Sequence, residues 1–308
     1  MLPLLKEMSL TVAAVRDDSI AAGAVILDEF AFDDSFPHGS IYTITDSLAQ
    51  DRGLFPMTFV GLDYDTRGLL WAVAEGGDVL ILDETSVAED GIDDLRAPLR
   101  DVLAIDGAGL VCGGNHQVYR RRNIEDWEDI GPDADLQEDY PENHFEAIAG
   151  FSASELYAAG RDGVIWWYDG AVWTPVQATT NLAFLCVTCA DDGVVYLGGQ
   201  AGVVAYGRRD SFEVATPPEP LADIWGIAEY AGQVRVAMHR ALMIFDRDAG
   251  LAVDPDAMEL AETFYNLERG PDSLWSLGEK EHWGKHVPWR ECVRMPLIIV
   301  PPRNYAPK

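Results

Sequence analysis

The sequence predicts an all-β chain of short antiparallel strands, and three observations support this prediction. Apolar and polar residues alternate with a period of two, and no window of comparable length shows the 3.6-residue apolar stripe of an amphipathic helix. Glycine, aspartate and asparagine recur at the corners between alternating segments, as antiparallel hairpins require. The same pattern also returns about every forty residues along the chain.

The repeat is clearest in YAAGRDGVIWWYDGAVW at 157–173, where an apolar strand, a glycine-containing turn and a second strand follow one another. Alternation places Trp166 and Tyr168 on one face of this unit and Trp167 on the other. Similar segments begin near residues 68, 109, 193, 232 and 273. Taking Trp71, Val111, Tyr157, Tyr196, Arg235 and Trp275 as equivalent, the steps are 40, 46, 39, 39 and 40 residues.

Each copy follows an apolar strand about ten residues upstream, and most copies precede a looser polar segment. One repeat therefore contains four short strands. A single four-stranded unit cannot bury both of its faces, whereas a ring of such units can, so the repeat predicts a β-propeller. The segment at 10–30 has the same strand, turn and strand order, and 40–46 would supply its outer strand. We therefore expect one seven-bladed propeller spanning 1–308.

The segment MPLIIV at 295–300 is an apolar strand without an obvious partner in its own blade. We expect it to pair beside N-terminal sequence, so that the two terminal segments close the ring and remove exposed sheet edges.

The blade cadence, best seen in YAAGRDGVIWWYDGAVWTPV and YLGGQAGVVAYG, resembles bacterial propellers of the BNR, YVTN and WD-repeat-like superfamily. This resemblance covers nearly the whole chain and implies architecture only, because propellers carry many unrelated functions. The repeated sialidase-type box and the repeated WD dipeptide are absent, so no functional residue is transferred.

The chain has 52 acidic and 22 basic residues, a formal net charge of -30. Such a field disfavours nucleic acid and anionic membranes as partners and favours a basic protein. Only four of the bases are lysines, so the alternative is a compositional bias of the source. We find no membrane-spanning run and no secretory signal, and four cysteines are too few for a disulfide framework, which together favour a cytoplasmic location.

Common catalytic signatures are missing, and we expect no catalytic residue, cofactor or metal. Cys186 and Cys189 are three apart in an apparent strand, which sends their thiols to opposite faces. His282 and His286 lie near glycine and proline rather than on a helix. Asp63 and Asp65 are interpreted as turn residues rather than calcium ligands.

The long 46-residue step contains an acidic insertion, expected as a loop at 125–143 and as the candidate partner-binding site. The candidate residues, acidic except for two aromatic anchors, are Glu125, Asp126, Trp127, Glu128, Asp129, Asp133, Asp135, Glu138, Asp139 and Tyr140. The alternative is a solvated acidic loop in which Trp127 packs in its blade as Trp173 does.

These observations favour a non-catalytic, protein-binding propeller, with an inhibitor or immunity protein against a basic toxin or enzyme as the sharpest version. Two alternatives stay open. One is a propeller enzyme or small-ligand binder, which would bring residues such as His144, Glu146 and Glu229 together at the central channel. The other is a scaffold subunit of a larger assembly.

Overall fold

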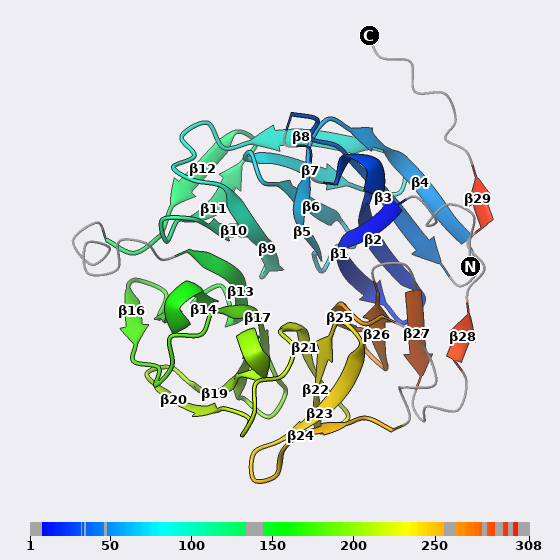
Figure 1. Ribbon diagram of the computed structural model, residues 1–308. Helices are drawn as coiled ribbons and strands as arrows, with labels where there is room; N and C mark the ends of the chain where they lie inside the picture. Colours follow the sequence, from blue (N-terminus) through cyan, green and yellow to red (C-terminus); the bar gives the residue numbers. More distant parts are fainter. Residues whose placement is uncertain are drawn as a thin grey trace.

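Seven antiparallel sheets surround a central axis as the blades of a propeller (Figure 1). The computed structural model describes residues 8–31, 33, 35–45, 48–133, 144–255 and 263–278, and the backbone alone of 282–286, 292–294 and 298–300. In every blade the four strands follow one another along the chain, and each pairs with the next. The predicted all-β, seven-bladed propeller is confirmed.

The strands of the first four blades are β1 Met8–Asp17, β2 Ile20–Leu27, β3 Gly39–Thr45 and β4 Leu48–Phe55; β5 Phe59–Tyr64, β6 Leu70–Ala74, β7 Asp78–Leu82 and β8 Val87–Gly91; β9 Leu99–Ile105, β10 Ala108–Gly113, β11 Val118–Asn123 and β12 Asp126–Asp129; and β13 Phe145–Ser152, β14 Glu155–Gly160, β15 Ile165–Tyr168 and β16 Trp173–Val176. The prediction that 40–46 forms the outer strand of the first blade is wrong. This segment is the third strand of its blade, because Leu48–Phe55 follows it as a further strand.

The remaining blades contain β17 Phe184–Cys189, β18 Val195–Gly199, β19 Val204–Arg208 and β20 Ser211–Ala215; β21 Ile224–Tyr230, β22 Gln233–Met238, β23 Ala241–Asp246 and β24 Gly250–Val253; and β25 Asn266–Arg269, β26 Ser273–Leu277, β27 His282–His286 and β28 Cys292–Arg294, with β29 Ile298–Val300 after them. Within the described residues, three single-turn 3-10 helices lie in the connections, at Asp28–Phe30, Arg161–Gly163 and Gln200–Gly202. No helix in the described part of the chain is long and apolar enough to cross a membrane.

The first strand of each blade is the innermost, and the seven inner strands contact one another in sequence around the axis. The ring closes where β1 packs against β25 and β26. At this joint the Asp18 carboxylate accepts hydrogen bonds from the Asp272 amide (2.8 Å) and the Ser273 hydroxyl (2.6 Å).

The C-terminal strand β29 pairs in parallel with β4, with Ile298 opposite Leu48. It therefore adds a fifth strand to the outer edge of the first blade, beside N-terminal sequence. The last blade already has four strands of its own without it.

Apolar side chains between neighbouring blades form the core, and strand alternation assigns each residue to one interface. Trp166 and Tyr168 belong to the cluster shared with the preceding blade, whereas Trp167 packs against the cluster shared with the following one. The predicted split of this aromatic run is confirmed. The largest fully buried side chains in the described part of the chain are Trp71, Trp166 and Trp275, each 0–2% exposed.

Glycines at the ends of four second strands allow the chain to approach the start of the inner strand closely. A Cβ at each of these glycines would lie too close to a carbonyl oxygen in the segment before the inner strand of the same blade. The distances are 2.3 Å for Gly113, 1.7 Å for Gly160, 2.1 Å for Gly199 and 2.4 Å for Gly278. The glycine pattern of the repeat thus has two causes. Gly160 gives close approach, whereas Gly163 of the following turn adopts a positive φ of 71°.

Substituting Gly160→Ala is expected to destabilise the protein by about 3 kcal/mol, because the added methyl group would meet the His144 carbonyl and backbone would have to move. Urea unfolding would measure this change. The control is Gly91→Ala, whose Cβ would meet nothing closer than 3.8 Å. Equal unfolding midpoints for the two variants would contradict the close-approach argument.

Candidate protein-binding site

The turns of the propeller divide between two faces of the ring. On the face we call the entry face, the inner strands begin; the connections between blades and the turns between second and third strands lie there. On the exit face, the inner strands end; the turns from first to second and from third to fourth strands lie there. Each outer strand, such as β12, runs along the rim from the exit face to the entry face.

The described part of the predicted acidic segment follows the rim rather than forming one patch. Glu125 lies in the exit-face turn before β12, Asp126–Asp129 form the outer strand itself, and Asp133 lies beyond its entry-face end. The departure from the repeat therefore begins after Asp129, not at Glu125. Asp135, Glu138, Asp139 and Tyr140 lie outside the described residues.

Trp127 is held by its blade. Its indole Nε1–H donates to the Asp90 carboxylate (3.2 Å), and its ring packs against the core cluster between the second and third blades. Asp90 also accepts from Arg121 (2.6 Å) and from the Glu125 amide (3.0 Å). These contacts favour the alternative interpretation, in which Trp127 is a packing residue.

Two of the predicted acids are already neutralised. Glu128 contacts Arg120 (2.7 Å) and Arg122 (2.5 Å) of the adjacent strand β11, and Asp129 contacts Arg96 of the preceding connection. The arginine opposite Glu128 in the ladder is Arg120, eight residues away in sequence. Glu125, Asp126 and Asp133 are exposed and form no ion pair within the described part of the chain.

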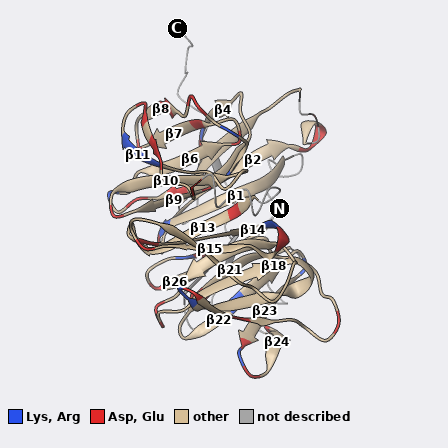
Figure 2. Cartoon of the chain, turned by 90° about the vertical axis from the view of Figure 1, so that its left-hand side faces the viewer, with Lys and Arg blue, Asp and Glu red and all other residues tan. Residues whose placement is uncertain are grey.

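Acidic side chains are spread over both faces. Exposed acids in the described exit-face turns are Asp83, Glu84, Asp106, Glu125, Asp169, Asp191, Asp192, Asp210, Asp248 and Asp272, with Arg67, Arg209 and Arg247 as the exposed bases. The described entry-face connections expose Asp28, Glu29, Asp33, Asp93, Asp94, Asp133, Asp162 and Glu219, with Arg96, Arg161 and Arg240. In Figure 2 the coloured residues gather in the turns, whereas most strand interiors are uncharged. Charge alone therefore selects neither face.

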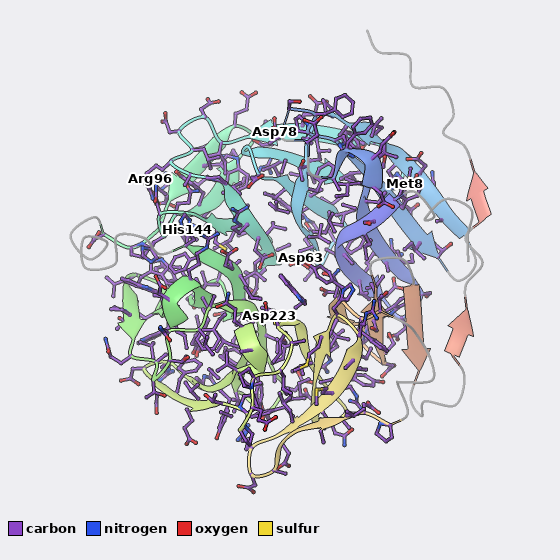
Figure 3. All side chains as sticks on the ribbon, viewed as in Figure 1. Met8, Asp63, Asp78, Arg96, His144 and Asp223 are labelled. Atoms are coloured by element: carbon purple, nitrogen blue, oxygen red, sulfur yellow. The ribbon has the colours of Figure 1, made fainter. Side chains whose placement is uncertain are left out.

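Carboxylates also link the inner strands of neighbouring blades. Asp63 of β5 lies beside the central channel (Figure 3) and accepts a hydrogen bond from the Ala104 amide of β9 at 2.7 Å. Asp101 of β9 accepts from the Ile148 amide of β13 at 2.9 Å. Each inner strand presents an unpaired edge toward the axis, so these carboxylates satisfy amides that no ladder partner reaches.

The channel shifts the titration of these groups. Burial raises the pKa of Asp63 to about 7 and that of Asp101 to about 7, against the opposing effect of their amide hydrogen bonds. Burial also raises the pKa of Glu268 on β25 well above its ordinary value, with repulsion from Asp63 and Asp101 as the further causes. The three carboxyl groups are therefore electrostatically coupled across the channel.

A cavity of about 410 Å³ occupies the channel, and its lining comes from all seven inner strands or the residues just before them. At its entry-face end, Trp225 is 38% exposed and stacks on Tyr265, with ring centroids 5.2 Å apart. Arg100, also in the lining, contacts Glu75 (2.6 Å) and Glu146 (3.6 Å). We call this region, formed by Trp225, Tyr265, Asp101, Asn266 and Glu268, the channel mouth.

The residues named for a channel enzyme do not converge. Glu146 lines the channel cavity and contacts Arg161 (3.0 Å), whereas Glu229 lines a separate cavity of about 520 Å³ together with Asp191, Asp192 and Asp272. Backbone pairing places His144 opposite Gly114 at the start of the fourth blade.

Cys186, Cys189 and Asp65 have structural roles, whereas the side chains of His282 and His286 lie outside the described residues. Cys186 packs against the core cluster shared with the sixth blade, and Cys189 against the cluster shared with the fourth, so the two thiols do lie on opposite faces of β17. Asp65 accepts the amides of Arg67 and Leu69 (2.9 and 3.0 Å), as expected of a turn residue. Within the described residues no group of His, Cys, Asp or Glu has the arrangement of a metal site.

Comparison with solved structures identifies the architecture. YCF48 bound to D1 peptide superposes with a TM-score of 0.68 over 93% of each chain at 16% identity. The WD40 β-propeller domain of Doa1 gives 0.64 at 9% identity over 88% of this chain and 89% of that one. The fold is that of a β-propeller. Virginiamycin B lyase from Staphylococcus aureus gives 0.61 at 10% identity, covering 78% and 84% of the two chains.

No family model matches the sequence. Among curated proteins, the immune protein Tsi7 of Pseudomonas aeruginosa is 36% identical over 191 residues. These residues are 60% of this chain and 61% of Tsi7, so the match spans less than two thirds of that protein.

Sequence reasoning treated Asp63 as a turn residue and missed Asp101, Glu268, Trp225 and Tyr265. A charged residue inside a mainly apolar inner strand is the signal that could have identified Asp63, Asp101 and Glu268, which lie in GLDYD, LRDVLAI and NLER. Trp225 and Tyr265 come from two different blades, so no local sequence pattern predicts that they stack.

We predict that the free energy of unfolding falls as the pH rises from about 4 to about 7, by about 1–3 kcal/mol for each of Asp63 and Asp101. Their pKa of about 7 in the folded protein exceeds the value of about 4 in the unfolded chain, so the folded state binds protons more tightly. Asp63→Asn with Asp101→Asn retains an acceptor oxygen and removes the ionisation, which should flatten the dependence. Urea unfolding at about pH 5, 6, 7 and 8 measures it.

The matched control is Asp169→Asn, an exposed turn residue whose carboxyl pKa is lowered by the amides of Val172 and Ala171 and which therefore stays ionised over this range. It should keep the wild-type slope. An unchanged slope in the double variant would rule out the channel carboxyls as its source.

Proposed function

We propose that this chain is an immunity-type protein that binds a protein effector in the cytoplasm and neutralises it. The observation that carries the proposal is the 36% identity to the immune protein Tsi7 over 191 residues. At that identity we expect the two chains to share their fold over the matched length. A propeller neighbour described with a bound peptide supports a protein as the partner.

The net charge of the chain supports an effector with a basic surface as the partner. A net charge of -30, with exposed acids on both faces, accelerates encounter with a cationic protein and opposes nucleic acid and anionic membranes. Within the predicted acidic segment, Glu125, Asp126 and Asp133 are the described acids without an ion pair among the described residues, so they contribute most to this attraction.

A growth assay tests the neutralising role. Each protein encoded beside this chain is expressed from an inducible promoter in a laboratory bacterium, with and without this chain. We expect one neighbour to arrest growth alone and to be tolerated when this chain is present, with the two proteins co-purifying. If every toxic neighbour stays equally toxic in its presence, the immunity role is wrong.

Charge reversal tests the contribution of the acidic segment. The triple variant Glu125→Lys, Asp126→Lys and Asp133→Lys should weaken binding of the neutralised effector about tenfold at low salt, mainly by slowing association. The difference should shrink at about 0.5 M salt, because exposed charges are screened. Calorimetric titration with that effector measures both values.

The matched control places three lysines on a distant part of the ring, at Asp210, Glu219 and Asp248, and changes the net charge equally. Equal weakening by both variants would assign the effect to net charge and remove the segment from the binding site.

A further inference from the structure

The channel mouth combines a cavity, an exposed aromatic surface and carboxyl groups without basic partners. The cavity holds about 410 Å³, within the range of small-ligand pockets. It opens beside Trp225, which is the most exposed tryptophan among the described large hydrophobic residues. An aromatic ring with that exposure, stacked on Tyr265, offers a rigid contact surface of the kind that anchors protein interfaces.

The arginines of this cavity are already paired, whereas two of its carboxyl groups are not. Arg100 contacts Glu75 and Glu146, and Arg269 contacts Asp191 (2.5 Å) and Glu229 (3.4 Å). Asp101 and Glu268 form no ion pair within the described part of the chain. An anionic ligand would therefore meet uncompensated carboxylates and arginines that are committed elsewhere.

A further polar group in the lining lacks a partner. The side-chain Nδ2 of Asn266 is buried and donates no hydrogen bond among the described residues. A buried donor without an acceptor is unfavourable by about 1–3 kcal/mol, and a carbonyl oxygen would remove that cost, whereas an arginine or lysine side chain has no acceptor. The lining thus favours a peptide loop, whose main-chain carbonyl groups can accept from Asn266 while a side chain of the loop donates elsewhere.

We propose that the channel mouth receives a cationic side chain, arginine or lysine, presented by a loop of the protein partner. Its aliphatic stem lies against Trp225 and Tyr265, and its charged end meets the carboxylate of Asp101 and the carboxyl group of Glu268. The stem buries apolar surface against the two rings, and a desolvated ion pair with a carboxylate adds directional contacts.

The identity of the partner rests on the proposed function, but the chemistry of the pocket does not. The first test therefore uses a small probe, Nα-acetyl-arginine amide, titrated into the full chain at about pH 8, which is above the pKa of about 7 of Asp101. We expect saturable binding with a Kd of about 1 mM, followed by tryptophan fluorescence. The neutral analogue Nα-acetyl-citrulline amide should bind at least tenfold more weakly.

Three variants assign the binding to the channel mouth. Trp225→Ala should abolish the fluorescence response, and Glu268→Gln and Asp101→Asn should each weaken binding about tenfold while keeping the size of the side chain. Glu219→Gln, an exposed acid on the same face but outside the cavity lining, is the matched control and should bind as the wild type does. Thermal unfolding of each variant verifies that the ring is intact.

Absence of saturable arginine binding, equal binding of the citrulline analogue, or wild-type binding by Glu268→Gln in a folded protein would each overturn the proposal. The outcome is separate from that of the growth assay, which uses no channel variant. Where that assay yields an effector, Trp225→Ala and Glu268→Gln should weaken its binding at least tenfold, and unchanged affinity would overturn the insertion of a side chain.

Discussion

The structure depends on one constraint, that a four-stranded sheet with two apolar faces cannot leave either face in water. Trp166 and Trp167 are adjacent in sequence but are buried in different interfaces, so each blade needs a neighbour on both sides. A row of blades would end with two uncovered faces, and only a ring has none. The first and last blades therefore have to meet, and the contact of β1 with β25 and β26 is the result.

Closing the ring creates a second requirement at the axis. Seven inner strands present their unpaired edges to a narrow channel, where amides still need acceptors. Asp63 and Asp101 supply acceptors by reaching across to the next blade, and the burial this demands raises their pKa. The polar chemistry of the channel is thus a consequence of the architecture, and the channel mouth begins where these groups meet the exposed aromatic pair.

The sequence predicted the architecture well because its signals are local. Period-two alternation, the spacing of second-strand residues such as Trp71 and Trp275, and the split of Trp166 from Trp167 need no knowledge of the fold beyond one strand. The site was less accessible. In the sequence, Glu128 stands in a run of acids, and its pairing with Arg120 follows only from the register of β11 and β12. Trp225 and Tyr265 are forty residues apart and stack only because their blades are neighbours.

The distribution of acids over both faces has a kinetic consequence. For a basic effector of the kind proposed, a field that is similar above and below the disc would raise the rate of encounter without favouring one face, so many first contacts would form on the wrong face or at the rim. Such contacts are weak and short-lived, because exposed charges are screened and hydrated. The choice between the two faces then depends on the rate of dissociation. The features that slow dissociation are the few that only one face has.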